Sequence, residues 1–227
     1  MNKEGIIVAV DGPSASGKST VSRRVAQAMG FLYVDSGAMY RGITWKCVKE
    51  GIDAKDTQEV TNLLIRIRME LVVRDQAVTY LIDGEDPGHE IRGEAVRERV
   101  ADIAAQQPVR VYIVSKLREM AKFGNLVMEG RDIGSVVFPD TPFKYYLDAD
   151  PEERARRRHA ELQKTEGADI EKIAQSLKNR DKKDSSRATS PLQIALGAKI
   201  INSTGMGIEQ VVGVILDDLR AAGIAEG

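Results

Sequence analysis

The chain has 227 residues, of which 33 are Lys or Arg and 34 are Asp or Glu, so its formal net charge at pH 7 is −1. This balance gives the molecule as a whole no attraction to nucleic acid or to an anionic membrane, and we expect neither as a partner. The length suits one core, or one core with an inserted lobe, and the single cysteine, Cys47, excludes an internal disulfide and a cysteine metal cluster.

The N-terminal residues and the apolar runs bear on location. No succession of basic, apolar and small residues precedes the first strand, so we expect no secretory signal. No apolar run approaches the roughly 20 residues that span a bilayer. A lone cysteine fits a reducing compartment. We therefore expect a soluble, cytoplasmic and monomeric protein.

The most specific motif follows the apolar run Ile6–Val10. Residues 12–19 read Gly-Pro-Ser-Ala-Ser-Gly-Lys-Ser and match the phosphate-loop pattern G-x-x-x-x-G-K-[ST]. Its glycines let successive backbone N–H groups point at one anion, and the following helix adds the positive end of its dipole. Lys18 should reach the β and γ phosphates, and Ser19 should offer its hydroxyl to Mg²⁺. We expect a nucleoside triphosphate to bind to Gly12, Pro13, Ser14, Ala15, Ser16, Gly17, Lys18, Ser19 and Thr20.

Further strand and helix patterns predict an α/β fold. Short apolar runs typical of buried strands occur at Phe31–Val34, Leu126–Met128, Phe143–Leu147 and Ala198–Ile201, and an amphipathic helix is expected from about Ile208 to Ala222. With the first strand, these runs predict a five-stranded parallel sheet flanked by helices on both faces.

Two segments are longer than simple crossovers. Between Gly51 and Gly124 we expect strands at Glu70–Val73 and Val78–Ile82, then helices at Glu94–Gln107 and Val109–Lys122. We place a small β-containing insert at about 62–95. A highly charged helical stretch at about 151–190 is expected to be an exposed, mobile lid. Both belong to one domain, residues 1–227.

Polar residues follow the second and third parallel strands. Asp35, Ser36 and Arg41 follow the second strand, and open α/β sheets bind ligands at that edge. After the third, Arg131 can grip a phosphate while either Glu129 or Asp132 orients a magnesium-bound water. The plainer alternatives are a helix cap with a surface arginine, and a turn with a surface ion pair.

Arginines also gather in the charged stretch. Arg154, Arg157 and Arg158 share one helix face, and a second group runs from Arg180 to Arg187. A solvated charged face is the ordinary explanation of such runs. Beside a phosphate loop, however, lid cations can neutralise the transferring group and exclude water. No general base is required if the acceptor is itself a phosphate, because its oxygen is already ionised.

Taken together, these segments resemble the bacterial cytidylate kinases, within the nucleoside monophosphate kinases, along essentially the whole chain. The resemblance rests on Asp11-Gly12-Pro13, Asp35 to Arg41, Gly130-Arg131-Asp132-Ile133-Gly134, Arg180 to Arg187 and Ser190-Pro191-Leu192. It implies a P-loop kinase fold with a monophosphate-binding insert and a helical lid. It also implies transfer of the γ-phosphoryl group of ATP to CMP or dCMP, with Mg²⁺.

The resemblance also implies roles for individual residues. The monophosphate nucleotide would be held by Asp35, Ser36, Tyr40, Arg41, Arg110, Arg131, Asp132, Arg180, Asp184 and Arg187. ATP would be held by the phosphate loop with Arg154, Arg157 and Arg158, and the metal by Ser19 and, through water, Glu129. The catalytic set would be Lys18, Arg131, Asp132, Arg158, Arg180 and Arg187.

Three positions depart from the family pattern. Glu129 stands where many members have Asp, Ala101 replaces a serine associated with a base contact, and Asn202 replaces an aspartate. A neutral hydrogen bond contributes about 0.5 to 1.5 kcal/mol, so the change at position 101 is expected to loosen the selection of cytosine.

Other function classes fit the sequence less well. The nearest alternative is another small-molecule kinase on this scaffold, acting on shikimate or a different nucleotide. A GTPase-like switch would need an Asn-Lys-x-Asp segment to read guanine, and the chain has none. A purely structural protein would leave the arginines without a role.

Overall fold

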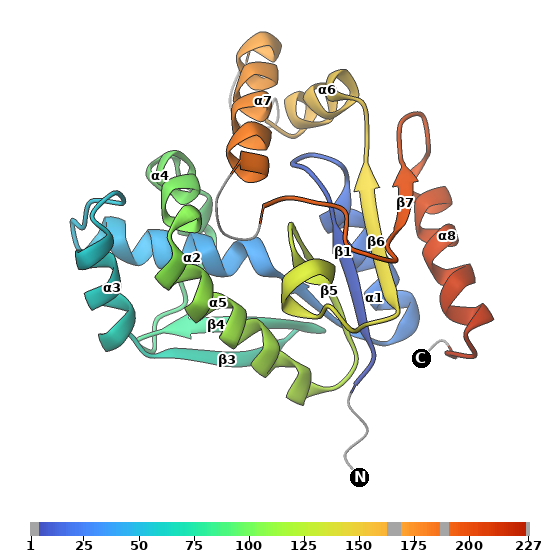
Figure 1. The fold of residues 1–227 in the computed structure, drawn as a ribbon, viewed down its shortest axis with the longest axis horizontal. Helices are drawn as coiled ribbons and strands as arrows, with labels where there is room; N and C mark the ends of the chain where they lie inside the picture. The colour runs from blue at the N-terminus through green and yellow to red at the C-terminus, as the bar shows by residue number, and fades with distance from the viewer. Residues whose placement is uncertain (1–4, 163–168, 187–190, 226–227) are drawn as a thin grey trace.

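The computed structural model describes residues 5–162, 169–186 and 191–225 (Figure 1). The strands are β1 (Ile7–Asp11), β2 (Leu32–Asp35), β3 (Met69–Arg74), β4 (Ala77–Ile82), β5 (Leu126–Gly130), β6 (Phe143–Asp148) and β7 (Lys199–Asn202). The α-helices are α1 (Lys18–Met29), α2 (Ser36–Lys49), α3 (Thr57–Arg66), α4 (Glu94–Ala105), α5 (Gln107–Glu119), α6 (Pro151–Leu162), α7 (Ile170–Ser186) and α8 (Ile208–Ala221). Shorter helical turns are η1 (Gly88–Arg92), η2 (Met120–Phe123) and η3 (Ile133–Val137).

The described strands form one seven-stranded sheet in the order β3-β4-β2-β5-β1-β6-β7. From β2 to β7, every neighbouring pair is parallel, so the five predicted parallel strands are confirmed. Figure 1 shows the arrowheads of β6 and β7 pointing toward α6. Since parallel strands share their carboxyl ends, the loops after β1, β2 and β5 open at one edge of the sheet.

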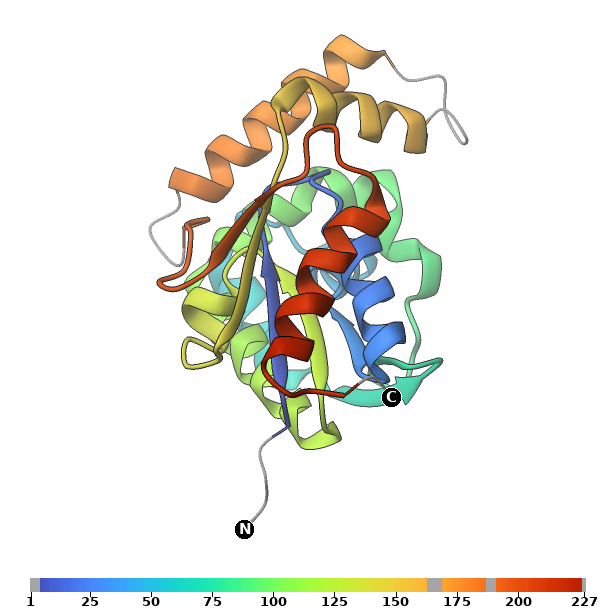
Figure 2. The same cartoon turned by 90° about the vertical axis from the view of Figure 1, so that its right-hand side faces the viewer.

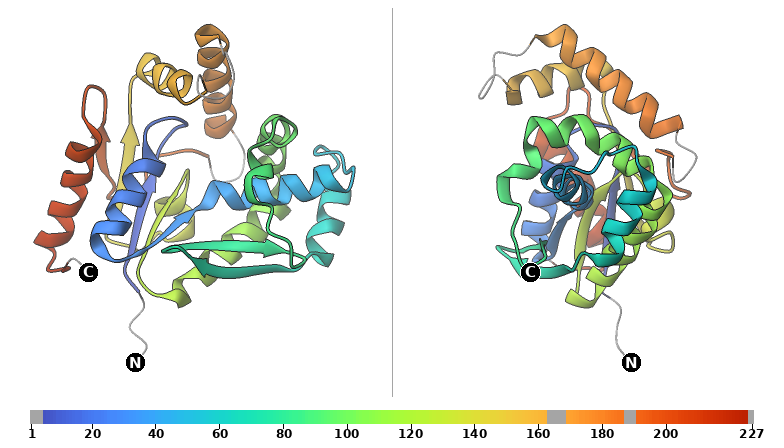
Figure 3. Two further views of the ribbon diagram at one scale, coloured as in Figure 1. Left: turned by 180° about the vertical axis from the view of Figure 1, so that it is seen from behind. Right: turned by 90° about the vertical axis from the view of Figure 1, so that its left-hand side faces the viewer.

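The two strands of the predicted insert extend the sheet. Strands β3 and β4 pair as an antiparallel hairpin, and β4 also joins β2 through Tyr33 and Ala77. Asp75 and Gln76 turn the hairpin at φ 47° and 57°, since a tight hairpin turn often needs two positive φ angles. Figure 3 shows the hairpin continuing the sheet outward on the β2 side. The bounds 62–95 for the insert and 151–190 for the lid stay predictions.

The sheet separates two apolar clusters. Along β1, Val8 and Val10 face one cluster with α1 and α8, whereas Ile7 and Ala9 face the other with helices α2 to α5. This split follows from the alternation of side chains along a strand. Figure 2 shows α1 and α8 side by side on their face. A strand buried on both faces reads as a continuous apolar run, which is why the sequence predicted β1.

The predicted charged stretch forms two helices over the carboxyl edge of the sheet. Helices α6 and α7 contact each other through Ala155, Ile173 and Leu177, and Ala15 of the phosphate loop packs against this small cluster. Figure 2 shows the pair lying across the top of the molecule. Within the described ranges, no helix combines the length and apolar character that crossing a membrane requires.

A pair of helical glycines gives a test of the packing between α2 and the hairpin. A Cβ on Gly42 of α2 would lie 2.5 Å from the Tyr80 hydroxyl of β4, whereas a Cβ on Gly213 of α8 would meet nothing within 4 Å. We expect Gly42→Ala to lower the free energy of unfolding by about 1 to 3 kcal/mol through overpacking. Gly213→Ala should raise it by about 0.5 to 1 kcal/mol through helix propensity. Urea denaturation measures both, and a stabilised Gly42→Ala variant would contradict the described contact.

Candidate active site

The phosphate loop forms a backbone cradle between β1 and α1. Gly12, Ala15 and Gly17 have φ angles of 148°, 61° and 94°, which turn the chain tightly. A Cβ on Gly12 would lie 2.0 Å from the carbonyl oxygen of Leu147, so this position needs glycine. Ser19 and Thr20 are exposed in the first turn of α1. The N–H groups at this helix start provide an anion site.

Lys18 is buried at the base of the cradle. Its Nζ donates to the carbonyl oxygen of Pro13 at 2.5 Å and to Ser16 Oγ at 3.3 Å. Burial, followed by repulsion from Arg131, lowers the pKa of Lys18 to about 7, while Glu129 and Asp11 act in the opposite direction. A triphosphate in the loop would favour the charged form, so Lys18 is suited to bind an anion.

Asp11 connects the phosphate loop to the segment after β5. Its Oδ1 accepts from the backbone N–H of Ile133 at 2.8 Å, and its Oδ2 accepts from that of Gly134 at 2.8 Å. Burial raises the pKa of Asp11 to about 6, although the two amides and Lys18 oppose the shift. The carboxylate therefore fixes the loop that carries Arg131 and Asp132 beside the phosphate loop.

The start of α2 lies on the other side of β5. Asp35 accepts from the backbone N–H of Ala38 at 2.9 Å and pairs with Arg41 at 2.7 Å, while Ser36 Oγ donates to the carbonyl oxygen of Glu129 at 2.7 Å. Burial would raise the pKa of Asp35, but Arg41 and the Ala38 amide hold it below its usual value. Because the Asp35 side chain caps the helix, α2 begins at Ser36.

Arg110 brings a buried charge to the same edge from α5. It is 2% exposed, forms an ion pair with Asp132, and lies with its guanidinium carbon 5.6 Å from the ring centre of Tyr40. In the described part of the chain, the Nε atoms of Arg110 and Arg41 are buried without a hydrogen-bond partner. Each guanidinium group is thus held in place by a carboxylate, while its buried Nε donor makes no hydrogen bond.

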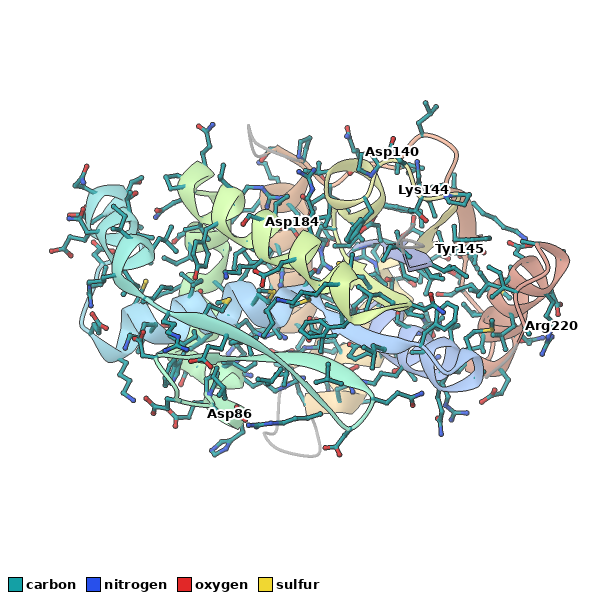
Figure 4. All side chains as sticks on the ribbon, turned by 90° about the horizontal axis from the view of Figure 1, so that it is seen from below. Asp86, Asp140, Lys144, Tyr145, Asp184 and Arg220 are labelled. Atoms are coloured by element: carbon teal, nitrogen blue, oxygen red, sulfur yellow. The ribbon has the colours of Figure 1, made fainter. Side chains whose placement is uncertain are left out.

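Arg131 and Asp184 join the core to α7. Arg131 Nε lies 3.0 Å from Asp184 Oδ2, and Asp184 is labelled in Figure 4. Arg180 is exposed at its surface, and desolvation by the neighbouring protein, followed by repulsion from Arg131, lowers the pKa of its guanidinium to about 10. A pocket of about 220 Å³ between α4 and α7 is lined by Ala101, Asp102, Ala105, Lys183, Asp184 and Ser186.

Two of the predicted lid arginines contact the phosphate loop. Arg154 Nη1 donates to the carbonyl oxygen of Ser14 at 3.3 Å and pairs with Asp181 at 2.5 Å. Arg157 Nη1 donates to the carbonyl oxygen of Ser16 at 3.3 Å. Arg158 instead pairs with Glu161 on its own helix at 2.9 Å. Arg187, which we also predicted to bind the substrate, lies outside the described residues.

Comparisons with known proteins identify the family of this chain. Residues 8–221 match the family model described as Cytidylate kinase. The chain belongs to the cytidylate kinase family. A cytidylate kinase of Nitrosomonas eutropha is 42% identical over 221 residues, covering 97% of each chain. One of Shouchella clausii is 41% identical over 215 residues, covering 94% of this chain and 96% of the relative.

A solved structure supports the fold alone. An uncharacterized protein from Eubacterium ventriosum has a TM-score of 0.55 at 12% identity, covering 95% of this chain and 98% of that chain. The family match confirms the predicted family, and with it a nucleoside monophosphate kinase that uses ATP. The α/β fold with a mostly parallel sheet is confirmed as well.

The donor set at this cytidylate kinase site fits Mg²⁺. The Ser19 hydroxyl and the buried Glu129 carboxylate offer the hard oxygen atoms that Mg²⁺ prefers. No group of three or more His, Cys, Asp or Glu side chains among the described residues could hold a metal by itself. In kinases, Mg²⁺ usually keeps several waters and binds largely through substrate phosphates.

Two buried residues of the site were missed by the sequence analysis. Ser203, after β7, accepts from Arg157 Nη1 at 3.0 Å through Oγ and from Nη2 at 2.8 Å through its carbonyl oxygen. Tyr33 on β2 donates its hydroxyl to Glu129 Oε1. Two features of the sequence could have indicated these residues. Ser203 is a polar residue directly after the last strand, and the alternation of side chains along β2 places Tyr33 on the α1 face.

The raised pKa of Asp11 predicts a pH dependence of stability. The pKa rises from 3.8 to about 6 on folding, so the folded chain holds this proton more tightly than the unfolded chain. The contribution of Asp11 to the free energy of unfolding should therefore fall as pH rises from about 4 to 6.5, by an amount on the order of 3 kcal/mol. Urea denaturation of the wild type and of Asp11→Asn across this range isolates the effect as their difference. A difference that stays constant with pH would contradict the raised pKa.

Proposed function

We propose that this cytidylate kinase transfers the γ-phosphoryl group of ATP to CMP or dCMP, giving ADP and the nucleoside diphosphate. The observation that carries the proposal is the pair of cationic loops that Asp11 joins at one sheet edge. The phosphate loop with Lys18 lies on one side, and Arg131 with the Arg110–Asp132 pair lies on the other. One cation set suits a triphosphate and the other a monophosphate.

On the donor side, the phosphate loop amides and Lys18 would bind the β and γ phosphates. Ser19 and, through a water, Glu129 would hold Mg²⁺, which supplies further neutralisation of phosphate charge. Arg154 and Arg157 on α6 donate hydrogen bonds to the carbonyl oxygens of Ser14 and Ser16 in the phosphate loop. If α6 moved, these bonds would break and the two charges would shift relative to the loop. Arg158 would join this set when the lid closes, whereas Arg187 would join the groups that hold the monophosphate.

On the acceptor side, a phosphate oxygen of the monophosphate is the nucleophile. It is ionised near neutral pH, so the protein needs no general base. This phosphate would be oriented by Ser36, Arg41, Arg131 and Arg180. The arginines and the sugar would be held by Asp35, Tyr40, Arg110 and Asp132. Positioned cations then stabilise the charge on the equatorial oxygens during direct in-line transfer.

The pocket between α4 and α7 is the proposed site for the base. Its lining includes the carboxylates of Asp102 and Asp184. Cytosine carries an amino group at C4 that can donate to a carboxylate, whereas uracil presents an acceptor there. Acidic groups in this pocket therefore favour cytosine. Since one chain supplies both the donor and the acceptor groups, we propose that the monomer is active.

An acceptor panel tests the proposed function. ADP formation from ATP and Mg²⁺ is followed with CMP, dCMP, UMP, AMP, GMP and shikimate supplied separately. We expect rapid turnover with CMP and dCMP, and weaker turnover with UMP because of the carboxylates in the base pocket. ATP binding without turnover of any acceptor would contradict the kinase function, and a preference for UMP would contradict the base-pocket assignment.

A further inference from the structure

The side chains of Tyr33 and Glu129 meet on the α1 face of the sheet. Tyr33 pairs in register with Val127, and Asp35 pairs with Glu129. Residues two apart on a strand point to the same face, so Tyr33, Val127 and Glu129 share one. Val127 packs in the cluster with α1 and α8, which identifies that face. Glu129 thus reaches the sheet edge on the side from which α1 begins.

Tyr33 is held between α1 and β5. Its hydroxyl donates to Glu129 Oε1, and each of the two residues is 5% exposed. The guanidinium carbon of Arg23 lies 4.1 Å from the centre of its ring. Arg23 follows Ser19 by one helical turn on α1. The tyrosine therefore touches the helix that carries one proposed metal ligand and the strand that carries the other.

The Glu129 carboxylate is buried, and it interacts with two neighbouring groups. It is near enough to favour the charged form of Lys18, and it accepts from Tyr33. A fixed donor on one oxygen restrains the carboxylate, because breaking a hydrogen bond to a buried charge costs free energy.

We infer that Tyr33 is a positioning residue for the metal-binding carboxylate: its hydroxyl fixes Glu129 Oε1 so that the other carboxylate oxygen is free to hold a water of the Mg²⁺ shell. This inference rests on the proposed role of Glu129 in the kinase reaction. Tyr33 touches neither substrate nor metal in this account, and it acts only through Glu129. Mutation of a residue that hydrogen-bonds and orients a metal ligand typically lowers metal affinity by about 10- to 100-fold.

Tyr33→Phe tests the inference because it removes only the hydroxyl and keeps the ring beneath Arg23. Tyr145→Phe is the matched control: Tyr145 is also buried and hydrogen-bonds a carboxylate, that of Asp218 on α8. Figure 4 shows Tyr145 on the α8 side of the molecule, away from Asp184. Both variants should lose a similar amount of thermal stability, since each leaves one carboxylate without its tyrosine donor.

The readout is the affinity of Mn²⁺ for the complex of full-length protein with β,γ-methylene-ATP, with free Mn²⁺ measured by its EPR signal. We expect Tyr33→Phe to weaken Mn²⁺ binding on the order of tenfold, and Tyr145→Phe to change it less than about twofold. Nucleotide affinity without metal should be unchanged in both variants. Equal Mn²⁺ affinities in Tyr33→Phe and Tyr145→Phe would overturn the positioning role of Tyr33.

Glu129→Gln, alone and combined with Tyr33→Phe, separates this inference from the proposed function. If Tyr33 acts through Glu129, adding Tyr33→Phe to Glu129→Gln should weaken Mn²⁺ binding by less than about a further twofold. A full additional tenfold loss in the double variant would overturn the inference. Unchanged Mn²⁺ affinity in Glu129→Gln would remove the metal role of Glu129 and the inference with it. The acceptor panel, which uses the wild type, would still decide the kinase function.

Discussion

The paired hydrogen bonds from Ile133 and Gly134 to Asp11 are the interaction on which the rest of the site depends. Asp11 ends β1 and Gly130 ends the neighbouring strand β5, so the two loops start side by side. Two hydrogen bonds of 2.8 Å to one buried carboxylate then fix one loop against the other. Phosphoryl transfer depends on the relative placement of donor and acceptor, and here two backbone amides bound to one buried carboxylate set that placement.

Four arginines of the site are each paired with a carboxylate. Arg41 pairs with Asp35, Arg110 with Asp132, Arg131 with Asp184 and Arg154 with Asp181. Clustered cations would otherwise repel one another at low dielectric. A phosphate that binds here exchanges with, or adds to, an existing partner, so the site needs little reorganisation. Two of these pairs end on α7, which makes that helix the element most directly coupled to the charge of the substrate.

The sequence predicted the parts of the molecule that depend on local patterns. The phosphate loop was recognisable because Gly12 and Gly17 sit at fixed spacing before Lys18, and the parallel strands were recognisable as apolar runs. Contacts between distant segments were not predictable in this way. The contacts of Asp11 with Ile133, Tyr33 with Glu129 and Arg157 with Ser203 join segments that are distant in sequence and adjacent only in the folded sheet. The single pairing of Tyr33 with Ala77 likewise has no local signal, so the addition of the hairpin to the sheet was not predicted.

The stereochemistry of transfer at phosphorus tests the central claim, that these two loops place donor and acceptor for direct transfer. ATP with a chiral, isotopically labelled γ-thiophosphate is turned over with CMP, and the configuration of the thiophosphate in the product is determined. A single in-line displacement between the fixed loops predicts inversion of configuration. Retention would contradict the account, because it would require two displacements through a phosphorylated side chain of the enzyme.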